Sequence, residues 1–394
     1  MTDILKNIKL LSENVIENKR VLLRVDFNVT LSENLEIVDD IRIEKSLPTI
    51  SLLLKNKNKI IIVSHLGRPK DREKKYSLSP IAAYLKTQFP EKNIMLVDDF
   101  LSENGGEILK NQAENDIILL ENIRFYKGEQ TNENEFSRQL AKLADIYIND
   151  AFGVSHRNDA SITGVPKILP SYCGLLLEEE VKAVEKIMNN PKQPLVVIIG
   201  GAKISTKIIF LSKLLLIADY ILLGGGLANT LITAQGLKLG KSLYEKDQLE
   251  KAKEILFTAG KHDTKIILPK DALGLENGKE KTYLINEIPD DFSILDIGDK
   301  TKEEFGEIIS QAKTIIWNGP LGFCEDQRFT NGTDFIFNAI AENSDAYSLI
   351  GGGDTLASVS KKDLSKISHV STGGGAMLQL IENGTLPGLD SLRL

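Results

Sequence analysis

The chain has 394 residues, of which 42% are hydrophobic and 26% are charged, a composition that excludes disordered, collagen-like and coiled-coil proteins. Its length suggests two or three globular units, and its net charge of -7 disfavours a nucleic-acid partner bound by bulk attraction to phosphates. No stretch approaches 18 uninterrupted apolar residues, and the two cysteines, Cys173 and Cys324, are interpreted as buried thiols. We therefore expect a reduced, cytoplasmic protein without a membrane span.

Short apolar runs rich in valine and isoleucine recur along the chain, and each is too short for a helix. The runs in the first half are Val21–Val25, Lys59–Ser64, Ile94–Val97, Ile117–Leu120 and Asp145–Ile148. The runs in the second half are Leu195–Ile199, Tyr220–Leu223, Lys265–Leu268, Thr314–Trp317, Tyr347–Ile350 and His369–Ser371. Most are apolar on both faces, which is typical of parallel strands covered by helices on both sides.

Amphipathic segments between these runs predict crossover helices, among them Ser79–Gln88, Glu133–Leu143, Ser205–Leu216 and Asp247–Thr258. This alternation favours open α/β sheets, and there are enough strands for two of them. A further periodic helix at Leu175–Met188 separates the two sets of strands and precedes asparagines and prolines that would end it. We therefore expect the boundary between two α/β domains at this connecting helix.

Arginine and glycine are distributed unevenly between the two halves. Eight of the ten arginines precede residue 173, whereas four clusters of glycines follow it, at Gly200-Gly201, Gly224–Gly226, Gly351–Gly353 and Gly373–Gly375. A guanidinium fork suits bidentate binding of carboxylate or phosphate, and glycine lets the backbone approach a ligand closely. The first half is therefore expected to bind a small anion, and the second half a larger ligand.

Basic side chains follow several predicted strands of the first half, at the sheet edge where ligands of open α/β folds bind. The candidates for one multiply charged anion are Arg42, His65, Arg68, Arg124 and Arg157. A solvated or helix-capping charge is the commoner explanation for any single arginine, but four arginines and a histidine at strand ends favour a shared site. Arg24 lies inside a strand, and we interpret it as structural and paired with a nearby carboxylate.

Glycines follow the predicted strands of the second half. Gly200-Gly201 precede Lys203 and a predicted helix that carries Lys207, an arrangement that offers backbone amides and lysines to a phosphate. Asp354 and Thr355 follow Gly351–Gly353 where another helix should begin, so Asp354 is either a helix cap or a ligand of Mg²⁺ on nucleotide phosphates. Because the strand-then-glycine pattern occurs four times, it predicts a phosphate-bearing ligand.

Together these segments resemble the phosphoglycerate kinase family over essentially the whole chain. The matching segments are RVDFNV (Arg24–Val29), SHLGRP (Ser64–Pro69), LLENIRF (Leu119–Phe125), YINDAFG (Tyr147–Gly153), GGAKIS (Gly200–Ser205), WNGPLG (Trp317–Gly322), GGGDT (Gly351–Thr355) and STGGGA (Ser371–Ala376). The resemblance implies reversible phosphoryl transfer, by domain closure, between 1,3-bisphosphoglycerate with ADP and 3-phosphoglycerate with ATP, in glycolysis and gluconeogenesis and with Mg²⁺ on the nucleotide. It also implies a monomer with no nucleic-acid or membrane partner.

The resemblance further implies two Rossmann-like α/β/α domains with mainly parallel sheets. Residues 1–172 would bind 3-phosphoglycerate, 173–190 would connect, 191–384 would bind Mg-nucleotide, and the tail 385–394 would pack on the first domain. The implied substrate-binding residues are Asp26, Phe27, Asn28, Arg42, His65, Leu66, Gly67, Arg68, Arg124 and Arg157. The implied nucleotide-binding residues are Gly201, Lys207, Gly225, Gly298, Glu325, Gly352, Gly353, Asp354 and Thr355, with Glu325 near the ribose and Asp354 at the metal. Lys203, Arg42 and Gly374 would stabilise the phosphoryl group in transfer.

Four positions depart from the family pattern, Thr30, Asp159, Lys270 and Asp299, and none carries an assigned chemical role. Two alternatives stay open at this point. A nicotinamide-dependent dehydrogenase of two α/β domains is disfavoured because a G-x-G-x-x-G motif with a downstream acidic residue is missing. A nucleotide-binding sensor that has lost catalysis is disfavoured by the presence of Lys203 and Asp354.

Overall fold

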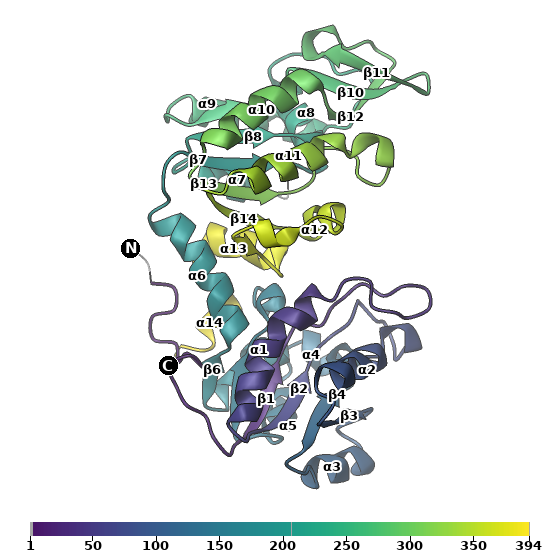
Figure 1. The fold of residues 1–394 in the computed structure, drawn as a ribbon, viewed down its shortest axis with the longest axis vertical. Coiled ribbons are helices and arrows are strands. Elements are labelled where there is room, and N and C mark those ends of the chain that lie inside the picture. The colour runs from purple at the N-terminus through teal and green to yellow at the C-terminus, as the bar shows by residue number, and fades with distance from the viewer. Residues whose placement is uncertain (1–2, 206, 394) are drawn as a thin grey trace. The chain divides into compact units, whose positions relative to one another are not determined.

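The computed structural model describes residues 3–205 and 207–393. Two compact units form, one from Met1–Lys182 together with Asn383–Leu394 and the other from Ala183–Glu382. The chain passes from the first unit to the second within helix α6 (Leu175–Asn189), where the sequence predicts a helix at Leu175–Met188. In each unit helices flank a parallel sheet, which confirms the expected α/β class (Figure 1).

The N-terminal unit is built on a six-stranded sheet in the order β3-β4-β2-β1-β5-β6, with every neighbouring pair parallel. The strands are β1 (Arg20–Arg24), β2 (Lys59–Val63), β3 (Asn93–Val97), β4 (Asp116–Leu120), β5 (Ile146–Asn149) and β6 (Ser171–Cys173). Five of these strands agree with the predicted runs to within one residue at each end. The sequence analysis missed β6, which has only three residues.

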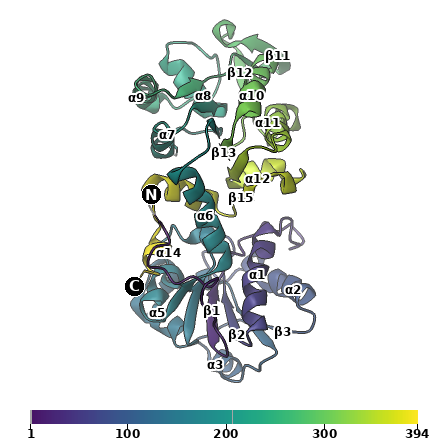
Figure 2. The ribbon, with the colours of Figure 1, turned by 60° about the vertical axis from the view of Figure 1, so that its left-hand side comes forward.

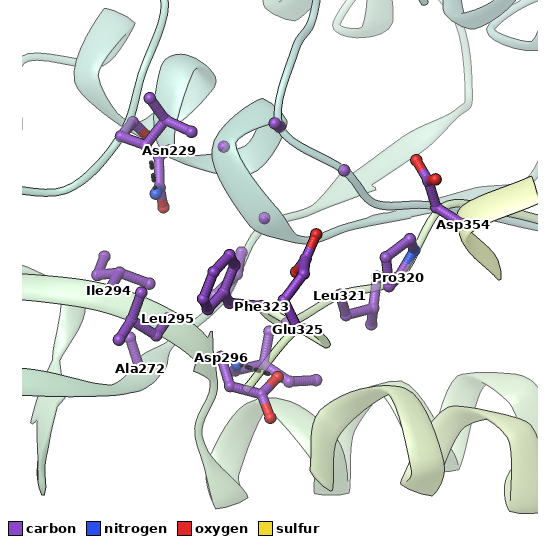
Figure 3. Close-up of a pocket in the computed structure, with 18 of the residues that line it drawn as sticks. Asn229, Ala272, Ile294, Leu295, Asp296, Pro320, Leu321, Phe323, Glu325 and Asp354 are labelled. Atoms are coloured by element: carbon purple, nitrogen blue, oxygen red, sulfur yellow. Dashed lines mark hydrogen bonds between the residues drawn. The ribbon is translucent and has the colours of Figure 1, made fainter. Parts of the chain in front are cut away.

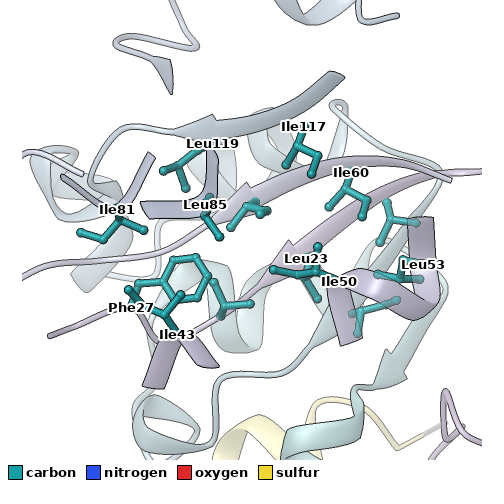
Figure 4. Packing of buried hydrophobic residues seen from close by; sticks show 14 of the residues in the cluster. Leu23, Phe27, Ile43, Ile50, Leu53, Ile60, Ile81, Leu85, Ile117 and Leu119 are labelled. Carbon is teal, nitrogen blue, oxygen red and sulfur yellow. The ribbon is translucent and has the colours of Figure 1, made fainter. Parts of the chain in front are cut away.

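Helices α1 (Ile41–Lys55), α2 (Ser79–Gln88), α3 (Glu103–Lys110), α4 (Lys127–Gln130) and α5 (Asn134–Ala141) accompany this sheet, with a short π-helical turn at Ala160–Gly164. Figure 4 shows how α1 packs Ile43, Ile50 and Leu53 against Leu23 and Ile60 of the central strands. All five side chains are fully or almost fully buried. Each such burial contributes about 1.5–3 kcal/mol, so this core holds the strand ends in place.

The C-terminal tail, including α14 (Pro387–Asp390), belongs to the N-terminal unit. The amide of Gly388 donates to the carbonyl of Ser155 at 2.8 Å, and the hydroxyl of Ser391 donates to the carbonyl of Ile162 at 3.1 Å. Arg393 pairs in an antiparallel bridge with Ile8, and Leu394 lies outside the described residues. These contacts tie the tail to the segment that contains the π-helical turn.

The C-terminal unit has a second six-stranded parallel sheet in the order β15-β14-β13-β7-β8-β9. The strands are β7 (Leu195–Ile199), β8 (Tyr220–Leu223), β9 (Lys265–Ile267), β13 (Thr314–Asn318), β14 (Tyr347–Gly351) and β15 (His369–Val370). A small antiparallel sheet, in the order β11-β10-β12, is formed by β10 (Asp271–Glu276), β11 (Lys279–Leu284) and β12 (Phe292–Ile297). The sequence analysis missed this second sheet.

The helices of this unit are α7 (Ile208–Leu214), α8 (Gly225–Ala234), α9 (Leu249–Ala259), α10 (Asp299–Gln311), α11 (Asn331–Glu342), α12 (Gly353–Val359) and α13 (Gly374–Asn383). Figure 2 shows α7 and α9 on the opposite side of the unit from α10 and α11. Helices α8, α12 and α13 each begin in a glycine run that follows a strand, and the sequence predicts the start of α12. In the part of the chain that the structure describes, no helix has both the length and the apolarity to cross a bilayer.

Candidate active site

The N-terminal unit contains a basic cavity of about 190 Å³ at the carboxyl ends of β1, β2 and β4 and in the loop after β5. Its lining residues are Asp26, Asn28, Arg42, His65, Gly67, Arg68, Arg124, Gly153, Val154 and Arg157. The carboxyl ends of these strands share one edge because the strands are parallel neighbours in the sheet. The structure thus brings all five predicted basic residues together and adds Gly153 and Val154, which the sequence analysis missed.

Two of the predicted substrate-binding residues, Phe27 and Leu66, lie in the core instead of the cavity lining, at 0% and 3% exposure. Their backbones still brace the site. The amide of Phe27 donates to Ser64 Oγ at 2.8 Å, and the carbonyl of Leu66 accepts from Asn122 Nδ2 at 2.7 Å. These residues therefore support the loops that carry the polar side chains.

Several guanidinium donors in this cavity have no acceptor among the described residues. Arg124 Nη1 donates to the carbonyl of Gly67 at 2.6 Å, but its buried Nε and Nη2 find no acceptor among the described residues, and neither does Arg157 Nε. Burial, with Arg157 and Arg24 nearby, lowers the pKa of Arg124 to about 10, so it stays protonated at neutral pH. Buried donors without acceptors are costly, and an anion in the cavity would satisfy them.

The carboxylate of Asp26 is the one negatively charged side chain among the cavity's lining residues. Its burial would raise its pKa, but Arg42, His65, Arg24 and the amide of Asn28 together bring the pKa below the ordinary value. Asp26 is therefore ionised at neutral pH and offsets one of the surrounding positive charges.

The ring of His65 is almost fully buried and is neutral at pH 7. Burial lowers its pKa well below the usual value, and the positive charges of Arg24, Arg124 and Arg42 lower it further against the opposing effect of Asp26. The cavity therefore presents a neutral imidazole beside four arginines.

Asn28 and Gly67 are hydrogen-bonded neighbours in the lining of the basic cavity. Asn28 Oδ1 accepts a hydrogen bond from the Gly67 amide at 2.7 Å, and Arg42 Nη1 donates to the Asn28 carbonyl. Gly67 has a φ of +63°, and a Cβ there would lie 2.4 Å from the Tyr76 ring. Only glycine fits this turn without displacing the ring.

A second cavity, of about 260 Å³, lies in the C-terminal unit next to the loops after β7, β8 and β13 and beside β12 (Figure 3). Apolar side chains form most of its wall, including Leu243, Ile294, Leu321 and Phe323. Glu325, in the loop after β13, and Asp354, in the first turn of α12, also line it (Figure 3). An apolar slot with carboxylates at its edge suits a ligand that has a flat apolar part and a polar part.

The predicted nucleotide-binding residues fall into two groups. Those that line the second cavity are Gly201, Gly225, Glu325 and Asp354. Those that lie outside its lining are Lys207, Gly298, Gly352, Gly353 and Thr355. Gly298 precedes α10, and a Cβ there would lie 2.3 Å from the Asp271 carboxylate carbon, so this position requires glycine for packing.

Two pairs of glycines let neighbouring loops touch in this unit. Gly225 has a φ of +64°, and a Cβ there would lie 2.6 Å from the Gly201 carbonyl oxygen. A Cβ on Gly374 would lie 2.3 Å from Gly352 Cα and 2.5 Å from Gly352 N. The loops after β7 and β8, and those after β14 and β15, therefore approach more closely than any side chain would permit.

The two predicted lysines differ in their surroundings. Lys207 Nζ donates to the carbonyls of Gly200 at 2.6 Å and Asn318 at 3.2 Å, and burial lowers its pKa to about 8 against the opposing charge of Asp354. Lys203 lies exposed in the loop between β7 and α7. The predicted helix Ser205–Leu216 is too long, because α7 begins only after Lys207.

Asp354 does not cap its helix. The cap position of α12 is Gly352, and no side chain supplies a capping hydrogen bond there, so the capping explanation of Asp354 is wrong. Asp354 is exposed at the edge of the cavity. The neighbouring Thr355 is buried, and its hydroxyl accepts from the Gly319 amide at 2.7 Å and donates to the Gly351 carbonyl at 3.1 Å. Thr355 thus joins the loops after β13 and β14.

The structure also shows the surroundings of the two cysteines and of two positions that depart from the family pattern, Lys270 and Asp299. Cys324 is partly exposed, not buried, and its thiol lies 3.4 Å from Thr333 Oγ1, whereas Cys173 is buried as expected. Lys270 pairs with Glu304 at 3.0 Å, and Asp299 pairs with Lys302 at 2.7 Å. These two departures from the family pattern are therefore engaged in ion pairs that lie outside the cavity lining.

Comparisons of sequence and of fold with known proteins relate nearly the whole chain to one family. The family model "Phosphoglycerate kinase" matches residues 11–384. Phosphoglycerate kinases from Dictyoglomus turgidum and Thermosipho africanus are 43% and 45% identical to the chain, with 98% and 96% of this chain and 99% and 96% of the relatives covered. The solved phosphoglycerate kinases of Coxiella burnetii and Pyrococcus horikoshii match with TM-scores of 0.85 and 0.86 at 38% and 30% identity, each covering 98% of both chains.

The dehydrogenase alternative fails against these matches, because sequence and fold relate the chain to kinases over nearly its whole length. The chain belongs to the phosphoglycerate kinase family.

Proposed function

We propose that the chain transfers a phosphoryl group reversibly between 1,3-bisphosphoglycerate with ADP and 3-phosphoglycerate with ATP, the reaction of its family in glycolysis and gluconeogenesis. The observation that carries this proposal is the basic cavity, whose lining includes Arg124 and Arg157. The buried donors Arg124 Nε, Arg124 Nη2 and Arg157 Nε have no acceptor among the described residues. The apolar cavity of the C-terminal unit would hold the nucleotide.

The charge of the basic cavity fits a phosphoglycerate. The molecule carries a carboxylate and a phosphate, and at neutral pH the two groups together hold between two and three negative charges. Arg42, Arg68, Arg124 and Arg157 supply four positive charges, of which Asp26 offsets one. Guanidinium groups bind both kinds of anion in a bidentate manner, so this residue set recognises a small, multiply charged anion.

The C-terminal cavity fits a nucleotide in a corresponding way. Leu243, Ile294 and Phe323 would contact an adenine base, and Glu325 would accept hydrogen bonds from ribose hydroxyls. The glycine loops that follow β7, β8, β14 and β15 offer backbone amides to phosphates. The phosphate contacts of Lys207, Gly298, Gly352, Gly353 and Thr355 stay predictions.

Magnesium is expected on the nucleotide, and the residues present fit a metal held mainly by its ligand. In the described residues no group of three or more histidine, cysteine, aspartate or glutamate side chains is placed to hold a metal ion. One exposed carboxylate, Asp354, stands at the edge of the nucleotide cavity. Mg²⁺ typically binds one or two carboxylates together with substrate phosphates and water, so Asp354 would hold it and the ion would neutralise phosphate charge.

No general base is needed for the proposed transfer. The acceptor in the ATP-consuming direction is a carboxylate, which is already ionised near pH 7. The protein therefore has to orient the reactants in line and neutralise charge on the moving phosphoryl group. Lys203, Arg42 and the amides of the loop at Gly374 would do this, and removal of one such contact typically lowers turnover roughly 10²–10³-fold.

Transfer further requires that the two ligands meet. The lining residues of the two cavities belong to different compact units, with α6 as the link. We propose that the units close about α6 when both substrates are bound, which would also exclude water and suppress hydrolysis. Small-angle scattering would show a smaller radius of gyration with both substrates than with either alone.

A coupled assay tests the function. Oxidation of NADH, through glyceraldehyde-3-phosphate dehydrogenase, should depend on both ATP and 3-phosphoglycerate. The sensor alternative predicts binding of both compounds without turnover. The paired variants Arg157→Gln in the basic cavity and Arg20→Gln outside it provide a control: only the first should raise the KM for 3-phosphoglycerate.

The oligomeric state and compartment also stay proposals. We propose a cytoplasmic monomer, on the basis of the glycolytic role of the family. Light scattering coupled to gel filtration should give a mass near 43.6 kDa, whereas a doubled mass would contradict the monomer.

A further inference from the structure

Arg24 is fully buried at the end of β1, immediately behind the basic cavity. Its Nε donates to Ser161 Oγ at 2.7 Å, and its Nη1 donates to the carbonyl of Val25. Its Nη2 lies 3.5 Å from Nδ1 of His65, one of the cavity residues. A buried guanidinium needs partners on each side, so these contacts define one orientation of the group.

Ser161 connects Arg24 to a buried carboxylate, and the connection has a fixed direction. The Ser161 hydroxyl donates to Glu129 Oε1 at 2.5 Å, and its amide donates to Oε2 at 2.9 Å. A hydroxyl has one proton, so the Ser161 oxygen can only accept the hydrogen bond from Arg24. Tyr147 holds the Ser161 carbonyl from the other side at 2.7 Å. The hydrogen bonds therefore run from Arg24 to Ser161 to Glu129.

The guanidinium of Arg24 determines which ring nitrogen of His65 can carry the proton. A guanidinium only donates hydrogen bonds, so an imidazole nitrogen that faces it must present a lone pair. Asp26 competes for the same nitrogen, because its Oδ1 lies 3.6 Å from His65 Nδ1. A carboxylate oxygen accepts hydrogen bonds, so a bond to Asp26 would require a proton on Nδ1. Because the His65 ring is neutral, a lone pair on Nδ1 puts the single ring proton on Nε2.

We propose that Arg24, oriented by Ser161 and Glu129, is a positioning residue that holds His65 in the Nε2–H tautomer, so that His65 gives a hydrogen-bond donor to the anion in the cavity. The opposite tautomer would direct a lone pair toward anionic oxygen, which is repulsive. Only the benefit to phosphoglycerate binding rests on the proposed function, since the tautomer is a property of the unliganded chain.

The tautomer can be measured directly. Full-length protein labelled with ¹⁵N-histidine contains four imidazoles, at His65, His156, His262 and His369, and the variant His65→Gln assigns the relevant signals. We expect, without ligand between pH 6 and 8, a pyridine-type shift for His65 Nδ1 and a protonated, pyrrole-type shift for Nε2. A proton on Nδ1, or on both nitrogens, would overturn the proposal without bearing on the enzyme activity.

The variant Ser161→Ala tests the relay. Without the hydroxyl, Arg24 Nε loses its acceptor and Arg24 can turn toward Glu129, which frees His65 Nδ1 to donate to Asp26. We expect the Nδ1–H tautomer to become the major form, and the Kd for 3-phosphoglycerate to rise about tenfold. An unchanged tautomer in folded Ser161→Ala would refute the role of Ser161 and Glu129.

Ser171→Ala is the matched control. Ser171 is also a buried serine of the N-terminal unit, but its hydroxyl donates to the carbonyl of Leu169 at 2.8 Å and not to a side chain of this network. We expect the wild-type tautomer and the wild-type Kd in this variant. If Ser161→Ala fails to fold, the tautomer in the unaltered protein still decides the proposal. Unaltered affinity together with a switched tautomer would also contradict it.

Discussion

The substitution Arg124→Lys offers a quantitative test of the basic cavity, because it keeps the charge and removes the planar fork. Arg124 uses Nη1 on the Gly67 carbonyl at 2.6 Å, while its buried Nε and Nη2 have no acceptor among the described residues. We propose that these two donors bind the ligand's phosphate or carboxylate. Lysine offers one compact ammonium group on a flexible stem and cannot reproduce both contacts.

The expected magnitude follows from the two lost hydrogen bonds. Hydrogen bonds to charged groups contribute about 1.5–3 kcal/mol each, and the retained ammonium recovers part of the total. A net loss of about 2.7 kcal/mol corresponds to a roughly 100-fold higher Kd for 3-phosphoglycerate, since each tenfold change requires about 1.4 kcal/mol. Isothermal titration calorimetry measures this Kd, and thermal unfolding verifies that the variant folds.

A matched control is Arg138→Lys. Arg138 is exposed on α5 and pairs with Glu135 at 3.0 Å, with side-chain exposures of 58% and 55%. We expect no measurable change in the Kd of this variant. If folded Arg124→Lys bound 3-phosphoglycerate with less than about a threefold loss, the assignment of its unpartnered donors to the ligand would be refuted.

Three further changes have defined outcomes. Lys203→Met should leave both substrate affinities near normal and lower kcat roughly 10²–10³-fold in the coupled assay, because the lysine is assigned to the transition state. Gly374→Ala should lower kcat by at least about tenfold, because its Cβ would lie 2.3 Å from Gly352 Cα and must separate two loops. Asp150→Asn should gain stability relative to the unaltered protein as pH rises from 4 to 7, by up to about 3 kcal/mol in urea unfolding.

The sign of the Asp150 prediction follows from its surroundings. Burial raises the pKa of Asp150 to about 6, although the Thr49 hydroxyl and the amides of Leu176 and Leu177 act in the opposite direction. The folded state therefore favours the protonated acid, and its stabilising contribution is complete below about pH 4 and lost as the pH rises through 6. An asparagine keeps an oxygen for both amides and does not titrate. An equal stability difference at pH 4 and pH 7 would contradict this account.

The predictions for Gly374→Ala and Lys203→Met each have a matched control variant. A Cβ on Gly375 would meet nothing within 4 Å, so Gly375→Ala should retain kcat where Gly374→Ala does not. Lys213 lies exposed in the last turn of α7, and Lys213→Met should likewise leave turnover unchanged. Retained turnover in Lys203→Met would exclude that residue from the transfer step.

Most of the parallel strands could be predicted from the sequence because they are short runs of branched apolar residues, whereas β6 (Ser171–Cys173) has only three residues and none of this type. The antiparallel sheet could not be predicted in the same way, since β11 (Lys279–Leu284) is rich in charged residues and mostly exposed. A local signal was nevertheless present. Asn277-Gly278, with φ values of +48° and +78°, forms the turn between β10 and β11, and an Asn-Gly pair is a strong hairpin signal.

The polar residues of the basic cavity were also predictable, because strand ends in a parallel sheet share one edge. The wall of the other cavity was not, since Leu243, Ile294 and Phe323 come from separate segments and resemble ordinary core residues in sequence. The expectation that Arg24 is structural agrees with its complete burial, but the expected direct pairing with a carboxylate was wrong, because its Nε donates to Ser161 Oγ. Glu129 lies more than 100 positions away, and the connection passes through Ser161, which no local pattern identifies.

The proposal that the basic cavity binds 3-phosphoglycerate and the apolar cavity binds the nucleotide is best tested by a crystal structure of the full chain with 3-phosphoglycerate and ADP bound. Density for 3-phosphoglycerate should lie within hydrogen-bond distance of Arg124 and Arg157, and density for ADP should lie in the slot beside Phe323 and Glu325. Occupation of the apolar slot by 3-phosphoglycerate, or of the arginine cavity by ADP, would contradict the account.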